Sequence, residues 1–310
     1  ITTEADAFKD RNAAKNFVYS CYGYLPQSNV ASGSLDLLTG DEVITAFEHE
    51  TFASFPKGNY TASSPVISYW NTFFQGLRQC YIFLENVDKV PDLTESVKTD
   101  YIAQVKFLIA YYHYQLARCY GPIILIKELP DVNASQAEYL PRTSYDECVD
   151  WICNLLDEAA SSLPAIRTNK EDYGLATSVG AKAVKAKMLL YAASPLFNGN
   201  SSFYSNFTDK SGSQLMPLTY DPNKWVKAKT AIKEAIDLAE QNGHALYVKQ
   251  DYKIGNEDAN PYPAAGPVRC LRTSLVDWDS RNPEVLLAET RSEGSYGIQN
   301  KSLPFVTDGW

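Results

Sequence analysis

The residues of this sequence best suited to chemistry are aromatic and polar side chains in long segments that lack helical periodicity. A sugar ring presents a face of C–H groups edged by hydroxyls, so a site for it needs a Tyr or Trp plane beside carboxylate, amide or guanidinium groups. The chain is rich in such rings, with 21 Tyr, 13 Phe and 5 Trp. Seven residues are expected to contact a ligand: Asp41, Glu42, Tyr60, Trp278, Arg291, Tyr296 and Trp310.

Local signatures of catalysis are absent from the sequence. It contains no P-loop, GxGxxG, GxSxG or HExxH motif. Of its three histidines, His113 falls in the middle of a helical pattern, where packing explains it. Paired carboxylates, such as Asp277 with Asp279, keep one enzymatic alternative open, because glycoside hydrolysis needs only two carboxyl groups about 5 to 10 Å apart. We expect no catalytic residue and no cofactor, with a carboxylate-based glycoside hydrolase as the alternative.

Charge and cysteine content narrow the classes of partner. The chain carries 28 Lys and Arg against 37 Asp and Glu, a net charge of −9, which argues against nucleic acid and anionic membrane surfaces. Its six cysteines permit up to three disulfides, but most lie in helical apolar patterns where free buried cysteine is common. No CxxC or His/Cys cluster occurs, so we expect no metal site.

Helices are expected to position these segments, because apolar residues recur every three or four positions through most of the first 240 residues. The pattern predicts six helices: 5–24, one beginning at Ser64 and Pro65, 94–120, 144–163, 177–198 and 221–243. The fourth is expected to open with a capping box at Ser144. Trp70, Trp151 and Trp225 are assigned to the core. Alanine-rich contact positions resemble tetratricopeptide-like helix pairs over about 64–242. Three long irregular stretches remain, 27–63, 199–220 and 244–310, and the whole of 1–310 is interpreted as a single all-α domain.

Five blocks of sequence follow one another along the chain. They begin with a Trp-initiated helix and the run that ends in Tyr120, Gly121 and Pro122. They continue through an Arg142-containing block, the helix that leads to Asn198, and the NPE motif, expected as a strand, that begins at Asn282. Their residue ranges are 68–87, 103–123, 140–164, 182–198 and 282–287. Taken in order, these blocks resemble the SusD/RagB family of outer-membrane nutrient-binding lipoproteins.

The resemblance implies a non-catalytic cell-surface protein that binds oligosaccharide and delivers it to a TonB-dependent, SusC-like transporter. It implies an outer-membrane location through a lipid anchor on a cysteine upstream of Ile1, and relatives that continue well beyond Trp310. The family's ligand contacts vary between members, so the seven residues above rest on loop chemistry alone. A helical-repeat scaffold that binds protein, or a peptide-binding nutrient protein, is a further alternative.

Overall fold

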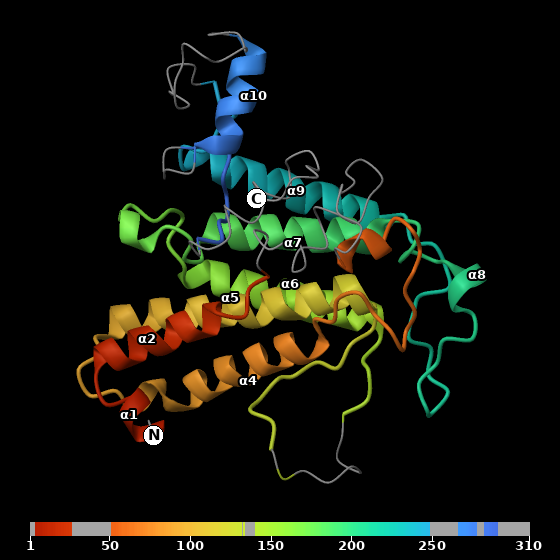
Figure 1. The fold of residues 1–310 in the computed structure, drawn as a ribbon, viewed down its shortest axis with the longest axis horizontal. Coiled ribbons are helices and arrows are strands. Elements are labelled where there is room, and N and C mark those ends of the chain that lie inside the picture. Colours follow the sequence, from red (N-terminus) through yellow and green to blue (C-terminus); the bar gives the residue numbers. More distant parts are fainter. Residues whose placement is uncertain are drawn as a thin grey trace, which may run out of the picture.

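Antiparallel helices stacked one after another form the body of the protein in the computed structural model (Figure 1), which describes residues 4–26, 51–131, 133, 140–248, 266–277 and 282–290. The helices of these ranges are α1 (Glu4–Ala7), α2 (Arg11–Tyr22), α4 (Trp70–Asn86), α5 (Glu95–Tyr120), α6 (Tyr145–Ser162), α7 (Ser178–Ala193), α8 (Ser201–Tyr204), α9 (Asn223–Gln241) and α10 (Pro267–Val276). Short 3-10 turns lie at Thr51–Ser54, Val87–Lys89 and Lys170–Asp172.

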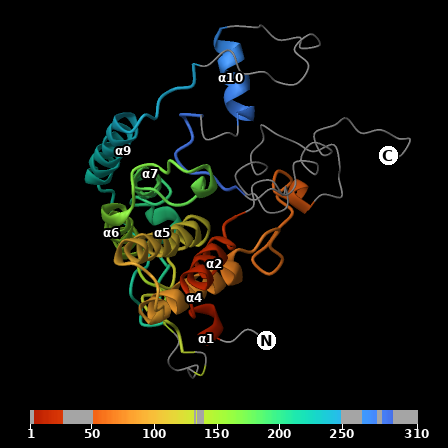
Figure 2. The same cartoon turned by 90° about the vertical axis from the view of Figure 1, so that its left-hand side faces the viewer.

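Consecutive helices pack against each other, which is the tetratricopeptide-like arrangement that the sequence predicts. α2 packs on α4 and α5, α4 on α5, α5 on α6, α6 on α7, and α7 on α9. Figure 2 shows α9 at the far side of this stack from α4, with α10 beyond it. Within the described ranges there is no strand, only isolated bridges at Thr61 with Ser64 and Thr208 with Gln214. The expected all-α fold class is therefore confirmed.

Helix α5 runs through the centre of the core. It begins after Thr94 and ends at Gly121, whose φ of 70° is a conformation that favours glycine. Its middle is buried on nearly every side, because α2, α4, α6 and α7 all contact it. The largest fully buried side chains of the described residues come mainly from α4, α5 and α6: Tyr112, Tyr145, Phe73, Phe83, Phe107, Leu77, Leu108, Ile109, Leu116, Ile123, Ile152 and Leu156.

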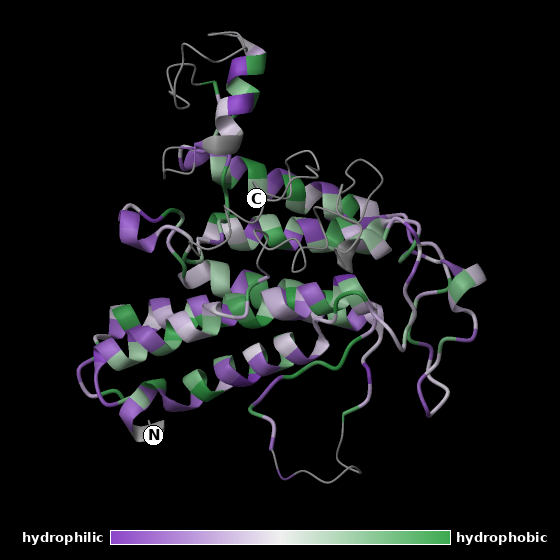
Figure 3. Ribbon diagram, viewed as in Figure 1, coloured by the Kyte–Doolittle hydropathy of each residue, from purple (hydrophilic) through white to green (hydrophobic). Residues whose placement is uncertain are grey.

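Helix α9 is held to α7 by small side chains. Ala186 on α7 packs with Ala231 and Ala235 on α9, and side chains this small let the two helix backbones approach closely. Figure 3 shows hydrophobic and hydrophilic residues alternating along α9, as expected for a helix covered on one side. No helix among the described residues combines the length and the apolar character needed to cross a membrane.

Several predicted helix boundaries are wrong, each for a local reason. The first helix is divided, since Asp10 caps a new helix by accepting a hydrogen bond from the Ala13 amide. The second begins at Trp70, because residues 61–64 form a small bridged turn instead. The fifth ends at Ala193 rather than near residue 198, and Pro195 explains the early stop. Helix α10 lies in a stretch expected to be irregular, although Pro267 at its first turn is a helix-start signal.

Three further expectations need correction. Ser144 precedes α6, but its side chain makes no capping hydrogen bond, so the capping box is not formed. Trp225 is not a core residue: 42% of its surface is exposed, because α9 contacts α7 through alanines and leaves the indole outside. The NPE segment that begins at Asn282 forms turns and irregular backbone rather than a strand. Trp70 and Trp151 do pack against the core.

Candidate functional site

A groove at the C-terminal end of α5 gathers aromatic side chains from three distant parts of the sequence. Its volume is about 630 Å³, within the range of roughly 300–1,000 Å³ typical of small-ligand sites. We call it the Tyr60 groove, and its lining residues are Phe55, Tyr60, Thr61, Ala62, Pro65, Val66, Ile67, Tyr69, Arg118, Cys119, Tyr120 and Tyr191.

The wall of the groove is fixed to the helices by the residues that lead into α4. The Tyr69 amide donates a hydrogen bond of 2.9 Å to the hydroxyl of Tyr120. The Trp70 ring meets the Tyr120 ring edge-on, with centroids 5.2 Å apart. Arg142 lies over Trp70 at 5.3 Å and donates a hydrogen bond of 3.0 Å to the Pro122 carbonyl. These contacts hold the segment before α4 against the end of α5.

Tyr60 presents the most accessible ring of the groove. Its exposed fraction is 51%, and its ring packs against Phe55 with centroids 5.3 Å apart. The bridge between Thr61 and Ser64 closes the turn directly after it, with amide-to-carbonyl hydrogen bonds of 3.2 and 3.1 Å. An exposed ring braced from one side is a suitable platform for the C–H face of a sugar. Arg118 and the hydroxyl of Thr61 line the same groove and supply polar groups.

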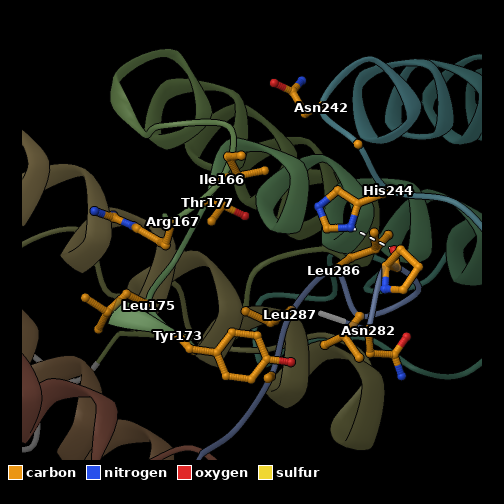
Figure 4. Close-up of a pocket in the computed structure, with 15 residues that line it drawn as sticks. Ile166, Arg167, Tyr173, Leu175, Thr177, Asn242, His244, Asn282, Leu286 and Leu287 are labelled. Atoms are coloured by element: carbon orange, nitrogen blue, oxygen red, sulfur yellow. Dashed lines mark hydrogen bonds between the residues drawn. The ribbon is translucent and has the colours of Figure 1, made fainter. Parts of the chain in front are cut away.

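A second hollow lies at the N-terminal end of α7, whereas the Tyr60 groove lies at its C-terminal end. There the NPE segment crosses the turn before α7 (Figure 4). The volume of this hollow is about 220 Å³. His244 Nδ1 and the Pro283 carbonyl are joined by a 3.0 Å hydrogen bond. The Tyr173 ring lines another part of the same hollow (Figure 4). A Cβ on Gly174 would approach Thr290 to 2.8 Å, so the segment is pressed closely onto the turn. This hollow is a small space beside a packing contact.

A third hollow, of about 780 Å³, lies beside the first half of α5, but three of its polar lining residues, Asp100, Gln104 and Arg167, already bind one another. Arg167 forks onto the Asp100 carboxylate with bonds of 3.0 and 2.8 Å, and also donates to the Ala176 carbonyl. Gln104 donates to Asp100 at 2.8 Å and accepts from Tyr22 at 3.0 Å. These bonds join α2, α5 and the turn before α7, so we interpret the cluster as structural.

Of the seven residues expected to contact a ligand, Tyr60 lies in the Tyr60 groove. The other six are outside the described residues: Asp41, Glu42, Trp278, Arg291, Tyr296 and Trp310. Of the carboxylate pair considered for glycoside hydrolysis, one residue lies within the described ranges and the other outside them. Asp277 is buried and accepts a 2.9 Å hydrogen bond from Tyr247, which indicates a structural role, and Asp279 is outside the described ranges.

The sequence interpretation missed the part of the groove that comes from helices. Tyr120 and Tyr191 lie at the ends of α5 and α7, where apolar periodicity assigns aromatic rings to the core. Their position near a helix end was the sequence signal that could have identified them as groove residues, because rings in a last turn lie at the edge of a helical stack.

Comparison with known proteins identifies the family. A model named SusD-like and described as starch-binding, associating with the outer membrane, matches residues 36–190. That range is half of the chain and contains three of the five blocks noted in the sequence. The chain belongs to the SusD-like family.

Solved structures agree with this assignment. The SusD-like chain is 36% identical to the protein BT4246, with a TM-score of 0.71 over 79% of this chain and 42% of that one. A SusD-like protein from Bacteroides fragilis is similar in fold, with 21% identity and a TM-score of 0.59 over 79% of this chain and 41% of that one. A laminarin-binding SusD-like protein has 21% identity and a TM-score of 0.52 over 60% of this chain and 41% of that one.

The SusD-like chain spans about two fifths of the length of these solved proteins. No curated protein sequence matches it.

Proposed function

We propose that this SusD-like chain binds oligosaccharide without catalysing its hydrolysis, and that the Tyr60 groove forms part of the binding face. The observation that carries the proposal is the half-exposed Tyr60 ring, braced by Phe55, in an aromatic groove of suitable volume. The description of the matched family as starch-binding, and a relative named for laminarin binding, support the same class of ligand.

The rest of the predicted site stays part of this proposal. Asp41, Glu42, Trp278, Arg291, Tyr296 and Trp310 have side chains that could extend the binding face with carboxylates, a guanidinium group and further rings. We propose no cofactor for binding, because stacking and hydrogen bonds suffice.

The cellular role that we propose follows the family resemblance. The chain, a single SusD-like domain, would act as part of a lipid-anchored protein at the outer membrane, and would pass captured oligosaccharide to a SusC-like, TonB-dependent transporter. The family's description as associating with the outer membrane supports the location. Capture of the transporter by the tagged protein from detergent-solubilised membranes would test the partner.

The first test is a screen of the 310-residue protein against a glycan array, followed by calorimetry with any ligand found. We expect Tyr60→Ala to weaken binding about tenfold, since loss of one stacking contact costs on the order of 1.4 kcal/mol. Tyr220→Ala is the matched control, because Tyr220 is 57% exposed and lies outside the groove. Equal losses in both variants, or none in Tyr60→Ala, would contradict the assignment of the groove.

Binding and catalysis are separated by a second measurement on the same ligand. We expect the oligosaccharide to be recovered intact after prolonged incubation with the protein, as judged by chromatography. Release of shorter products would contradict a purely binding function and favour the glycoside hydrolase alternative.

A further inference from the structure

Two of the six cysteines meet in the core between neighbouring helices. Cys21 lies on α2 and Cys80 on α4, and each has 0% of its surface exposed. The two helices pack directly against each other (Figure 1). Both side chains are thiols in this structure, as are those of the other four cysteines.

Contacts on either side of this pair fix the register of the two helices. The rings of Phe17 and Phe83 have centroids 6.2 Å apart. A Cβ placed on Gly76 would lie 3.0 Å from the Cβ of Tyr24. Moving forward from Phe17 on α2 to Tyr24, two residues past the end of α2, therefore means moving backward along α4. Cys21 and Cys80 both lie between these two contacts.

Gly76, one turn before Cys80 on α4, leaves room for its neighbours, since a Cβ there would lie 3.0 Å from the Tyr24 side chain and 3.1 Å from the Tyr112 ring. The position of α2 is also held by Tyr112 of α5, whose hydroxyl donates a hydrogen bond to the Cys21 carbonyl. A disulfide needs Cα atoms about 4.4 to 6.8 Å apart, so the two cysteines must oppose each other across the contact between α2 and α4.

The Cys21 thiol also affects the Cys80 thiol. Burial raises the pKa of Cys80 well above its usual range, and the neighbouring Cys21 thiol raises that pKa further. Cys148 differs, since its thiol is directed to the Thr143 carbonyl at 3.4 Å. Because the thiolate is the reactive species, the Cys80 thiol of the folded protein is protected from exchange, and full burial denies reagents access to Cys21. Oxidation of this pair would therefore take place during folding, before α2 packs against α4.

We propose that Cys21 and Cys80 form a disulfide bond that joins α2 to α4 when the chain folds in an oxidising compartment. The oxidant is an external disulfide, either a small molecule or a thiol oxidoreductase. One cysteine, deprotonated, attacks that disulfide and releases a first thiol. The second cysteine, also deprotonated, attacks the mixed disulfide and releases a second. The two cysteines lose two electrons, which reduce the external disulfide to two thiols.

The test begins with protein refolded from denaturant in a glutathione redox buffer. Remaining thiols are trapped with N-ethylmaleimide under denaturing conditions, and the digest is analysed by mass spectrometry without reductant. We expect one linked pair of peptides, containing Cys21 and Cys80, and alkylation of the other four cysteines. Alkylation of both residues, or pairing of either with another cysteine, would overturn the proposal.

A second measurement tests whether the bond stabilises the fold. The oxidised protein should melt about 5 °C or more above protein refolded with reductant, because the bond closes a loop of roughly 60 residues. A double variant, Cys21→Ala with Cys80→Ala, should lose this dependence on reductant, and Cys119→Ala should keep it. Equal melting temperatures for the two wild-type forms would overturn the stabilising role.

Discussion

At the scale of single residues, His113 shows how one side chain joins a helix to the segment that follows it. Its Nδ1 donates to the Ile109 carbonyl at 2.8 Å, and its Nε2 accepts from the Ile126 amide at 3.1 Å. The ring also meets Trp151 edge-on, with centroids 4.7 Å apart. The expectation that His113 is a packed helix residue is confirmed, and both ring nitrogens are occupied in its neutral form.

The burial of His113 predicts a pH dependence of stability. Burial lowers its pKa from 6.5 to about 4. The unfolded state therefore binds the proton more readily than the folded state. Above pH 6.5 the ring is neutral in both states, and the free energy of unfolding is at its full value. It falls as the pH drops from 6.5 toward 4, by about 3 kcal/mol in total.

Urea unfolding at several pH values would measure this effect. We expect the free energy of unfolding of the wild type to fall more steeply between pH 6.5 and 4 than that of His113→Gln, which does not titrate there. The carboxylates titrate in both proteins, so the difference between the two curves isolates the histidine. Parallel curves would contradict the prediction.

At the scale of elements, the helix starts show that residue type alone does not decide a cap. Thr177 and Ser144 both precede a helix, and both residue types favour this position. Only the Thr177 side chain accepts a hydrogen bond, from the Gly180 amide at 3.0 Å. The Ser144 side chain makes no capping hydrogen bond to the first turn of α6.

This difference predicts unequal costs for the same substitution. Thr177→Ala should lower the free energy of unfolding by about 1 kcal/mol, because an amide at the start of α7 loses its partner. Ser144→Ala should change it by less than about 0.5 kcal/mol, since no capping bond is lost. Chemical denaturation of the two variants side by side would measure both values. A larger cost at Ser144 would show that the cap assignment is reversed.

At the scale of the whole molecule, the net charge of −9 bears on the choice of ligand. Like charges slow diffusional encounter, so the chain should associate more slowly with an anionic oligosaccharide than with a neutral one. Salt screens exposed charges over about 10 Å at 0.1 M, so the difference should shrink as salt is added.

A sulfated and an unsulfated form of one bound oligosaccharide would provide a matched pair for this prediction. Association rates measured by surface plasmon resonance should differ at low salt and converge at high salt. Faster association of the sulfated form would indicate a local basic surface that outweighs the net charge.

The sequence by itself determined the helical class, the order of the main helices and the family resemblance. These features rest on local patterns: apolar spacing along α5, Gly121 and Pro122 at its end, and alanines along α9. Such patterns are read within one segment, and they predicted the bounds of α5 to within one residue. They failed where the deciding contact came from elsewhere, as for Trp225, which no neighbouring element covers among the described residues.

Only the tertiary structure decided what surrounds Tyr60. The groove needs the ends of α5 and α7 to meet a segment that precedes α4, so it depends on contacts between residues as distant as Tyr60 and Tyr191. The same holds for Cys21 and Cys80, which periodicity assigns separately to the apolar faces of two helices. Helix packing sets which positions on those faces oppose each other, because residues of particular size, such as Gly76 with no side chain, fix the register.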